Sequence, residues 1–286
     1  MPTVAAFCDR VAAAFPIGDA DAYAALFDFP CIFFTDTGFD YRASPAEAAA
    51  RAPLIRAAAE AVGAARMGLR VLAQRTFGAS LTTVRVETWL EFRGGGESDA
   101  YAELWVLRQS PRGLRLAAVM NPISAWLLDL PPSAPRPAAP GPGLRLRPNE
   151  AGTDRGVHRL VDAMTDSFNA GDEAAQIALM DLPQAKITDE RTDVMTDPDR
   201  LGRRVESVFG ALERHGPLRL VQTPMFVRPF GACLQIARVE VTATLPDGRA
   251  ATPVQELWIL RTADDALRIA AFVNPFAPSF VPEPDA

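Results

Sequence analysis

The sequence predicts an α+β fold built from two copies of one module, and three observations support this. The segment ELWVLR at residues 103–108 returns as ELWILR at residues 256–261, an offset of 256 − 103 = 153. The same offset pairs Phe15 with Phe168 and many other positions, which is the signature of an internal duplication. Within each copy, helical apolar spacing comes first and strand-like segments follow, an order typical of helices packed on one face of a sheet.

Three helices are expected at the start of each copy. Apolar residues at helical spacing predict the first helix over residues 4–15 and again over 157–168. The pairs Gly18-Asp19 and Gly171-Asp172 combine a helix stop with an N-cap, and so predict a short second helix. A cap followed by proline, at Ser44-Pro45 and Asp197-Pro198, begins a third helix that reaches about residue 65 and about residue 215.

The rest of each copy is expected to be strand. Pro30 and Pro183 prevent helix continuation and introduce short extended segments at residues 31–35 and 184–188. The strands of the first copy are expected at roughly residues 67–77, 80–92, 100–109 and 114–121, and the second copy repeats them.

The predicted division of the chain is a first module at residues 1–130, a linker at 131–152 and a second module at 153–286. The linker is rich in proline, alanine and glycine, a composition typical of an extended segment without a core of its own. Each module is long enough for a single hydrophobic core.

Composition argues against several classes of partner and site. The formal net charge is −6 and no basic run occurs, so we expect neither nucleic acid nor a membrane as a partner. The three cysteines do not recur between the copies, which favours reduced thiols over disulfides or a metal site. No metal and no cofactor is expected. The start of the chain lacks a signal-peptide pattern, and we expect a cytoplasmic location.

The order of elements resembles the nuclear transport factor 2-like superfamily, which includes SnoaL-like polyketide cyclases and ketosteroid isomerases. The most specific local match is Phe168-Asn169-Ala170-Gly171-Asp172, followed by Ala178-Leu179. The resemblance implies cone-shaped, cystatin-like modules, in which a curved antiparallel sheet wraps the helices around an apolar pocket. It also implies that modules pair through their sheets, here as an intrachain pseudo-dimer.

The hairpin that follows residue 244 places one carboxylate inside each predicted pocket. If Asp247-Gly248 forms a two-residue type I′ turn, Val239 lies opposite Glu256 and Ala237 opposite Trp258. The face that carries these residues is apolar apart from Glu256, so we expect it to be concave. The first copy places Glu103 and Trp105 in the same way if Gly94-Gly95 takes the place of Asp247-Gly248.

Two interpretations of Glu103 and Glu256 stay open. A carboxylate in an apolar pocket has a raised pKa and can donate a hydrogen bond or shuttle a proton. The resemblance supports this interpretation, because both residues fall near the neutral acid of ketosteroid isomerases. Alternatively, each is a structural acid satisfied by neighbouring donors. Trp105 and Trp258 are either ligand platforms or core.

The remaining catalytic positions of the isomerase pattern are vacant. The general-base position falls on Thr35 and Thr188, whose hydroxyls cannot act as bases at neutral pH, and the oxyanion tyrosine falls on Val11 and Met164. Thr35 and Thr188 remain candidate ligand contacts, with a turn-stabilising role as the alternative.

Three functions are consistent with this pattern. The first is binding of a small, largely apolar molecule in one or both pockets, with Glu103 or Glu256 as the polar contact. The second is a cyclase, isomerase or dehydratase that uses the glutamate as acid or base. The third is a structural or protein-interaction unit with filled pockets. One module could be active and the other degenerate, since the first carries the bulkier Phe33 where the second has Lys186.

Overall fold

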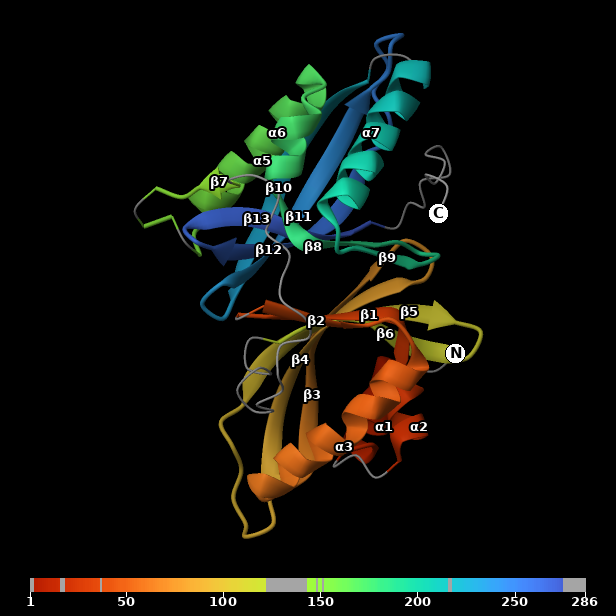
Figure 1. Ribbon diagram of the computed structural model, residues 1–286, viewed down its shortest axis with the longest axis vertical. Helices are drawn as coiled ribbons and strands as arrows, with labels where there is room; N and C mark the ends of the chain where they lie inside the picture. Colours follow the sequence, from red (N-terminus) through yellow and green to blue (C-terminus); the bar gives the residue numbers. More distant parts are fainter. Residues whose placement is uncertain are drawn as a thin grey trace. The chain divides into compact units, whose positions relative to one another are not determined.

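A computed structural model describes residues 3–15, 19–36, 38–121, 143–147, 149–150, 152–215 and 218–274. For residues 211–215 it describes the backbone alone. The chain divides into two compact units, Met1–Ala134 and Pro135–Ala286. Each unit combines a sheet with helices that cover one of its faces (Figure 1). The predicted two-module α+β fold is therefore confirmed. The predicted pairing of the modules stays a prediction.

The first unit begins with helices α1 (Val4–Ala13) and α2 (Ala20–Ala24), and α3 (Pro45–Ala61) follows two short strands. Thr3, Asp19 and Ser44 are the N-caps, and each side chain accepts a hydrogen bond from the first turn of its helix. Helix α3 ends four residues earlier than expected, because Gly63 takes a left-handed φ of +72° and turns the chain into the sheet.

The sheet of the first unit has the order β2-β1-β6-β5-β4-β3. Its strands are β1 (Phe27–Thr35), β2 (Gly38–Arg42), β3 (Ala64–Phe77), β4 (Leu81–Phe92), β5 (Tyr101–Ser110) and β6 (Gly113–Met120). All neighbours are antiparallel except β1 and β6, which run parallel. The core joins helix α1 to the inward face of the sheet, and its largest members are Phe7, Phe27 and Trp105.

The second unit repeats this plan. Its helices are α5 (Asp154–Ala170), α6 (Glu173–Ala178) and α7 (Pro198–His215). Its sheet has the order β10-β11-β12-β13-β8-β9, again with one parallel pair, β13 and β8. The strands are β8 (Met180–Ile187), β9 (Thr192–Met195), β10 (Arg219–Phe230), β11 (Leu234–Thr244), β12 (Val254–Ala263) and β13 (Ala266–Val273).

Helix α5 shows why the second core forms. Val157, Leu160, Val161 and Met164 recur at intervals of three and four residues, so they lie on one helical face, and all four are buried against the sheet. Gly171 ends the helix in the left-handed conformation, as the sequence pattern predicts.

The predicted strand register is confirmed, but the predicted turn is wrong. Val239 lies opposite Glu256 and Ala237 opposite Trp258. A type I′ turn needs positive φ at both central residues, and of Asp247 and Gly248 only Gly248 has it, at +83°.

The loop is one residue longer than a type I′ turn. The N–H of Gly248 donates a hydrogen bond to the carbonyl of Leu245. The N–H of Leu245 donates a hydrogen bond to the carbonyl of Arg249. The bridge between Thr244 and Ala250 is therefore offset by one residue, and an irregularity before Val254 restores the register.

Part of the predicted linker belongs to the second unit. Leu144–Arg145 form strand β7, which pairs with the start of β13, and Glu150 forms an ion pair with Arg159 of α5. Residues 131–142, and with them the predicted boundary at residue 130, lie outside the described residues.

Candidate functional site

In the first module, Glu103 is enclosed by hydrogen-bond donors. Strand β5 points Glu103 and Trp105 to the same side because side chains alternate along a strand. The indole Nε1–H of Trp105 donates to Oε2 of Glu103 at 2.5 Å, and Nδ2 of Asn121 donates to Oε1 at 2.6 Å. Tyr101 adds a third side-chain hydrogen bond. Glu103 is 6% exposed.

Burial raises the pKa of Glu103 to about 7, even though the hydrogen bonds from Trp105 and Tyr101 pull it down. The charged form loses its hydration in this interior, and the donors replace only part of it. Burial also raises the pKa of the Tyr101 hydroxyl, so Tyr101 acts here as a hydrogen-bonding group rather than as a proton source. This arrangement fits a satisfied, structural acid.

In the second module, Glu256 repeats two of these three contacts. Nε1–H of Trp258 donates to Oε2 at 2.8 Å and Nδ2 of Asn274 donates to Oε1 at 2.5 Å. Val254 occupies the position of Tyr101, so the third donor has no equivalent. Glu256 as a residue is half-buried, while its carboxyl group is enclosed, and burial raises the pKa of that carboxyl group.

Lys186 distinguishes the second module from the first. It lies on β8 between Asp193 of β9 and Phe272 of β13, and Phe272 in turn lies opposite Trp258. Cross-strand neighbours share a face of the sheet, so Lys186 lies on the face that carries the buried Trp258.

The charges around Lys186 act in both directions. Burial, and then the charge of Arg204, lower the pKa of Lys186 to about 8, while Glu256 and Asp193 act in the opposite sense. The electrostatic effect is mutual, since the charge of Lys186 lowers the pKa of Glu256. Asp193 is itself paired with Arg191, whose Nε lies 3.1 Å from its Oδ2.

Several buried side-chain donors of this module have no hydrogen-bond acceptor among the described residues, and two of them concern the surroundings of Lys186: Nε2 of Gln184 and Nη2 of Arg204. Gln184 is 2% exposed and lies opposite the core residue Met195, so it faces the same interior as Lys186. Arg204 projects from α7, and its pKa is lowered chiefly by burial. The side chains of Lys186, Gln184 and Arg204 and the carboxyl groups of Glu256 and Asp193 thus place polar groups beside the apolar core.

The equivalent region of the first module is filled by aromatic rings. Phe33 stands at the position of Lys186, and the guanidinium of Arg42 lies 4.0 Å from the centre of its ring. Arg42 also donates to the hydroxyl of Tyr23 at 2.8 Å. Phe27 contacts the rings of both Tyr23 and Phe33. This packing leaves the first module with an aromatic interior around the guanidinium of Arg42, whose Nε has no acceptor among the described residues.

The hydroxyls of Thr35 and Thr188 are engaged in turns. Oγ1 of Thr35 donates to the carbonyl of Gly38 and accepts from its N–H at 3.1 Å. Oγ1 of Thr188 accepts from the N–H groups of Glu190 and Arg191 at 3.3 and 3.2 Å. Their role as ligand contacts stays a prediction, and the turn-stabilising alternative accounts for these hydrogen bonds.

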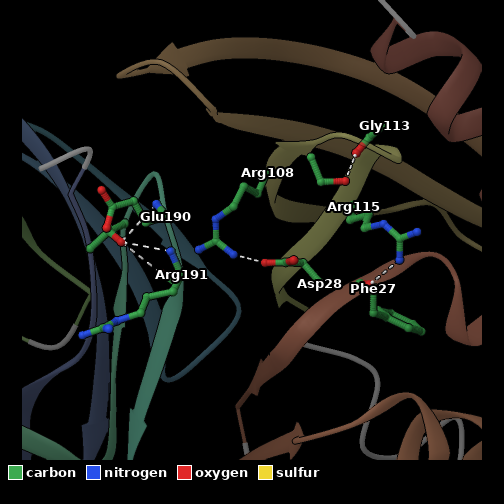
Figure 2. A network of polar contacts seen from close by, with 9 residues as sticks. Phe27, Asp28, Arg108, Gly113, Arg115, Glu190 and Arg191 are labelled. Atoms are coloured by element: carbon green, nitrogen blue, oxygen red, sulfur yellow. Dashed lines mark hydrogen bonds and ion pairs between the residues drawn. The ribbon is translucent and has the colours of Figure 1, made fainter. Parts of the chain in front are cut away.

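A recurring ion pair was missed at the sequence level. Figure 2 shows the pair of Asp28 and Arg108, which joins β1 to β5 in the first module. In the second module Nε and Nη2 of Arg261 both lie 2.7 Å from Oδ2 of Asp181. The offset of 153 relates the two pairs, and this recurrence was the signal that could have identified them.

Other kinds of site find no support in the described part of the chain. There, no group of three or more His, Cys, Asp and Glu side chains is arranged to hold a metal ion. All three cysteines are free, and burial raises the pKa of Cys31 to about 12. None of the described helices is both long and apolar enough to cross a membrane.

Comparison with known proteins yields similarity of fold. No protein-family model and no curated protein matches the sequence. Among solved structures, a cystatin-like protein of unknown function from Nostoc punctiforme is 22% identical, covers 42% of this chain and 78% of its own, and has a TM-score of 0.35. A ketosteroid isomerase-like protein from Erwinia carotovora is 20% identical to this chain, with a TM-score of 0.32. The match covers 42% of this chain and 92% of the length of that protein.

An NTF-2 like protein of unknown function from Shewanella oneidensis is 9% identical over 42% of this chain and 96% of its own, with a TM-score of 0.36. Each of these matches covers less than half of the chain. They concern the fold and identify no substrate.

Proposed function

We propose that the second module binds a small, largely apolar molecule that carries an oxygen acceptor. The supporting observation is the pair of buried donors without an acceptor, Nε2 of Gln184 and Nη2 of Arg204, beside the amine of Lys186. A buried donor without a partner costs roughly 1–3 kcal/mol, so an acceptor on a ligand stabilises the site when it enters. The surrounding core residues, among them Trp258 and Phe272, supply the apolar contact.

The first module is proposed to be the degenerate copy. Glu103 has three donors of its own, and Phe33 replaces the lysine. The filled-interior interpretation therefore fits the first module, and the binding interpretation fits the second. We expect one ligand per chain rather than two.

Native mass spectrometry of freshly purified protein, followed by extraction of small molecules, tests this proposal. One co-purifying molecule per chain is expected, with occupancy reduced at least about tenfold in Gln184→Leu, which removes one of the donors. Glu103→Gln, a change in the polar group of the other module, should leave occupancy unchanged. No ligand from the wild-type chain, together with no thermal shift from added apolar carboxylic acids or ketones, contradicts the proposal.

An enzyme that uses Glu256 as acid or base is the second candidate. It is favoured by the donors within hydrogen-bond reach of that carboxyl group, Trp258 and Asn274, and by its raised pKa. Turnover of the co-purified molecule that is lost in Glu256→Gln, while its binding persists, would favour catalysis over binding alone.

A further inference from the structure

We propose that Lys186 captures the carbonyl group of an apolar aldehyde or ketone as a protonated imine, with Glu256 as the proton donor. This inference rests on the proposed function and names the chemical class of its ligand. It starts from composition: Lys186 is the only lysine among the 29 lysine and arginine residues of the chain. Lysine is almost always a surface residue, yet this one lies on the inward face of β8.

The neighbours of Lys186 suit an amine that reacts rather than one that holds a fixed charge. No described carboxylate forms a salt bridge with it: Asp193, directly opposite, is held by Arg191. Arg204 adds a positive charge that disfavours the ammonium form. With a pKa of about 8, roughly a quarter of the amine is neutral at about pH 7.5, against about 0.1% of an ordinary lysine.

The step balances between the two side chains. The nitrogen lone pair of neutral Lys186 adds to the carbonyl carbon, and the π electrons move to oxygen. The carboxylic acid of Glu256 supplies a proton, and the carbinolamine hydroxyl leaves as water. The products are one iminium ion, one carboxylate and one water, so net charge is unchanged. Nε2 of Gln184 and Nη2 of Arg204, which have no acceptor among the described residues, can donate hydrogen bonds to the carbonyl oxygen while it becomes a hydroxyl group and leaves as water.

Forming the iminium of Lys186 and the carboxylate of Glu256 away from water costs free energy. Their mutual attraction, which is stronger there than at the surface, offsets part of this cost. The apolar core residues around Trp258 hold an apolar ligand chain and exclude bulk water. The first module cannot carry out this step, because Phe33 has no amine.

The test is reductive trapping of the intact chain. The protein is incubated with hexanal or benzaldehyde and sodium cyanoborohydride at about pH 7.5, with Nα-acetyl-lysine amide in the same tube as an ordinary amine. Peptide mapping, which separates Lys186 from the terminal α-amine of the chain, should show an adduct at Lys186 that forms at least about tenfold faster than on the reference amine. Lys186→Met should abolish it, and Lys186→Arg provides a variant that keeps the charge.

Glu256→Gln should slow trapping at least about tenfold, because the proton donor is gone. Glu206→Gln, an exposed change on α7, should not. Circular dichroism shows which variants fold. Labelling of Lys186 no faster than the reference amine overturns the inference. If native mass spectrometry still shows a retained non-covalent ligand, the proposed binding function stands and the imine inference fails. If neither a retained ligand nor a covalent adduct is seen, the binding function and the imine inference both fail.

Discussion

At the level of single residues, the two glutamates show how one position can acquire different chemistry after a duplication. Glu103 has Trp105, Asn121 and Tyr101 as donors, whereas Glu256 keeps the first two and gains the charge of Lys186. The common feature is an acid whose protonated form is favoured by burial.

The raised pKa of Glu103 has a consequence for stability. Its pKa is 4.5 in the unfolded chain and about 7 in the folded one, so the folded state binds more protons between these values. The stabilisation is fully present below pH 4.5 and is lost as pH rises through about 7, a loss of roughly 3 kcal/mol relative to a group that does not titrate. Glu103→Gln should remove this loss, as measured by urea unfolding across roughly pH 5 to pH 8.

Glu60→Gln is the matched control, because Glu60 is exposed on α3 and the change in charge is the same. Its curve should run parallel to that of the wild-type chain. A Glu103→Gln curve that is also parallel to wild type would mean that Glu103 is ionised throughout this range.

At the level of secondary structure, the sequence predicts what depends on neighbouring residues and misses what joins distant ones. The register of β11 and β12 was predicted from a two-residue turn at Asp247-Gly248, and the register is correct although the turn is not. The loop itself was not predictable, because a three-residue loop followed by an irregularity leads to the same register. The place of Lys186 was missed because no turn signal ties β8 to β13, its parallel neighbour.

The ion pair between β8 and β12 makes a prediction of its own. Asp181 and Arg261 have side chains only 3% and 5% exposed, so removing one partner leaves a buried charge unpaired. Asp181→Ala should lower the free energy of unfolding by about 3–5 kcal/mol. The double variant Asp181→Leu/Arg261→Met should recover most of this loss, since it leaves no unpaired charge.

Asp247→Ala is the surface control for the ion pair. Asp247 pairs with Arg249, but their side chains are 51% and 76% exposed, and such pairs contribute at most about 1 kcal/mol. Urea unfolding of the four proteins decides the matter. A double variant as unstable as Asp181→Ala alone would show that packing rather than charge pairing holds β8 to β12.

At the level of the whole molecule, the repeat of 153 residues predicted two similar folds but not their divergence. Pairs such as Trp105 and Trp258 are identical, and the structure places them alike. Which copy has a polar interior depends on substitutions such as Phe33 for Lys186. The effect of these substitutions becomes visible only when strands and helices are assembled. Gln184 and Lys186 belong to β8, whereas Arg204 belongs to α7, so the sequence alone does not show that they lie close together.

The two cores also predict how the chain unfolds. Leu107 and Leu260 are equivalent residues, both 0% exposed, and each belongs to the core of its own module. Truncation to alanine removes buried methyl groups and costs about 2–5 kcal/mol. Since the chain divides into two compact units, Leu107→Ala should accelerate hydrogen exchange in β4–β6, and Leu260→Ala in β11–β13, each with little effect on the other unit. Mass spectrometry of peptic peptides measures this, with the reciprocal variant as the control. If either substitution accelerates exchange in both units equally, the modules unfold as one cooperative body, and the two cores depend on each other for their stability.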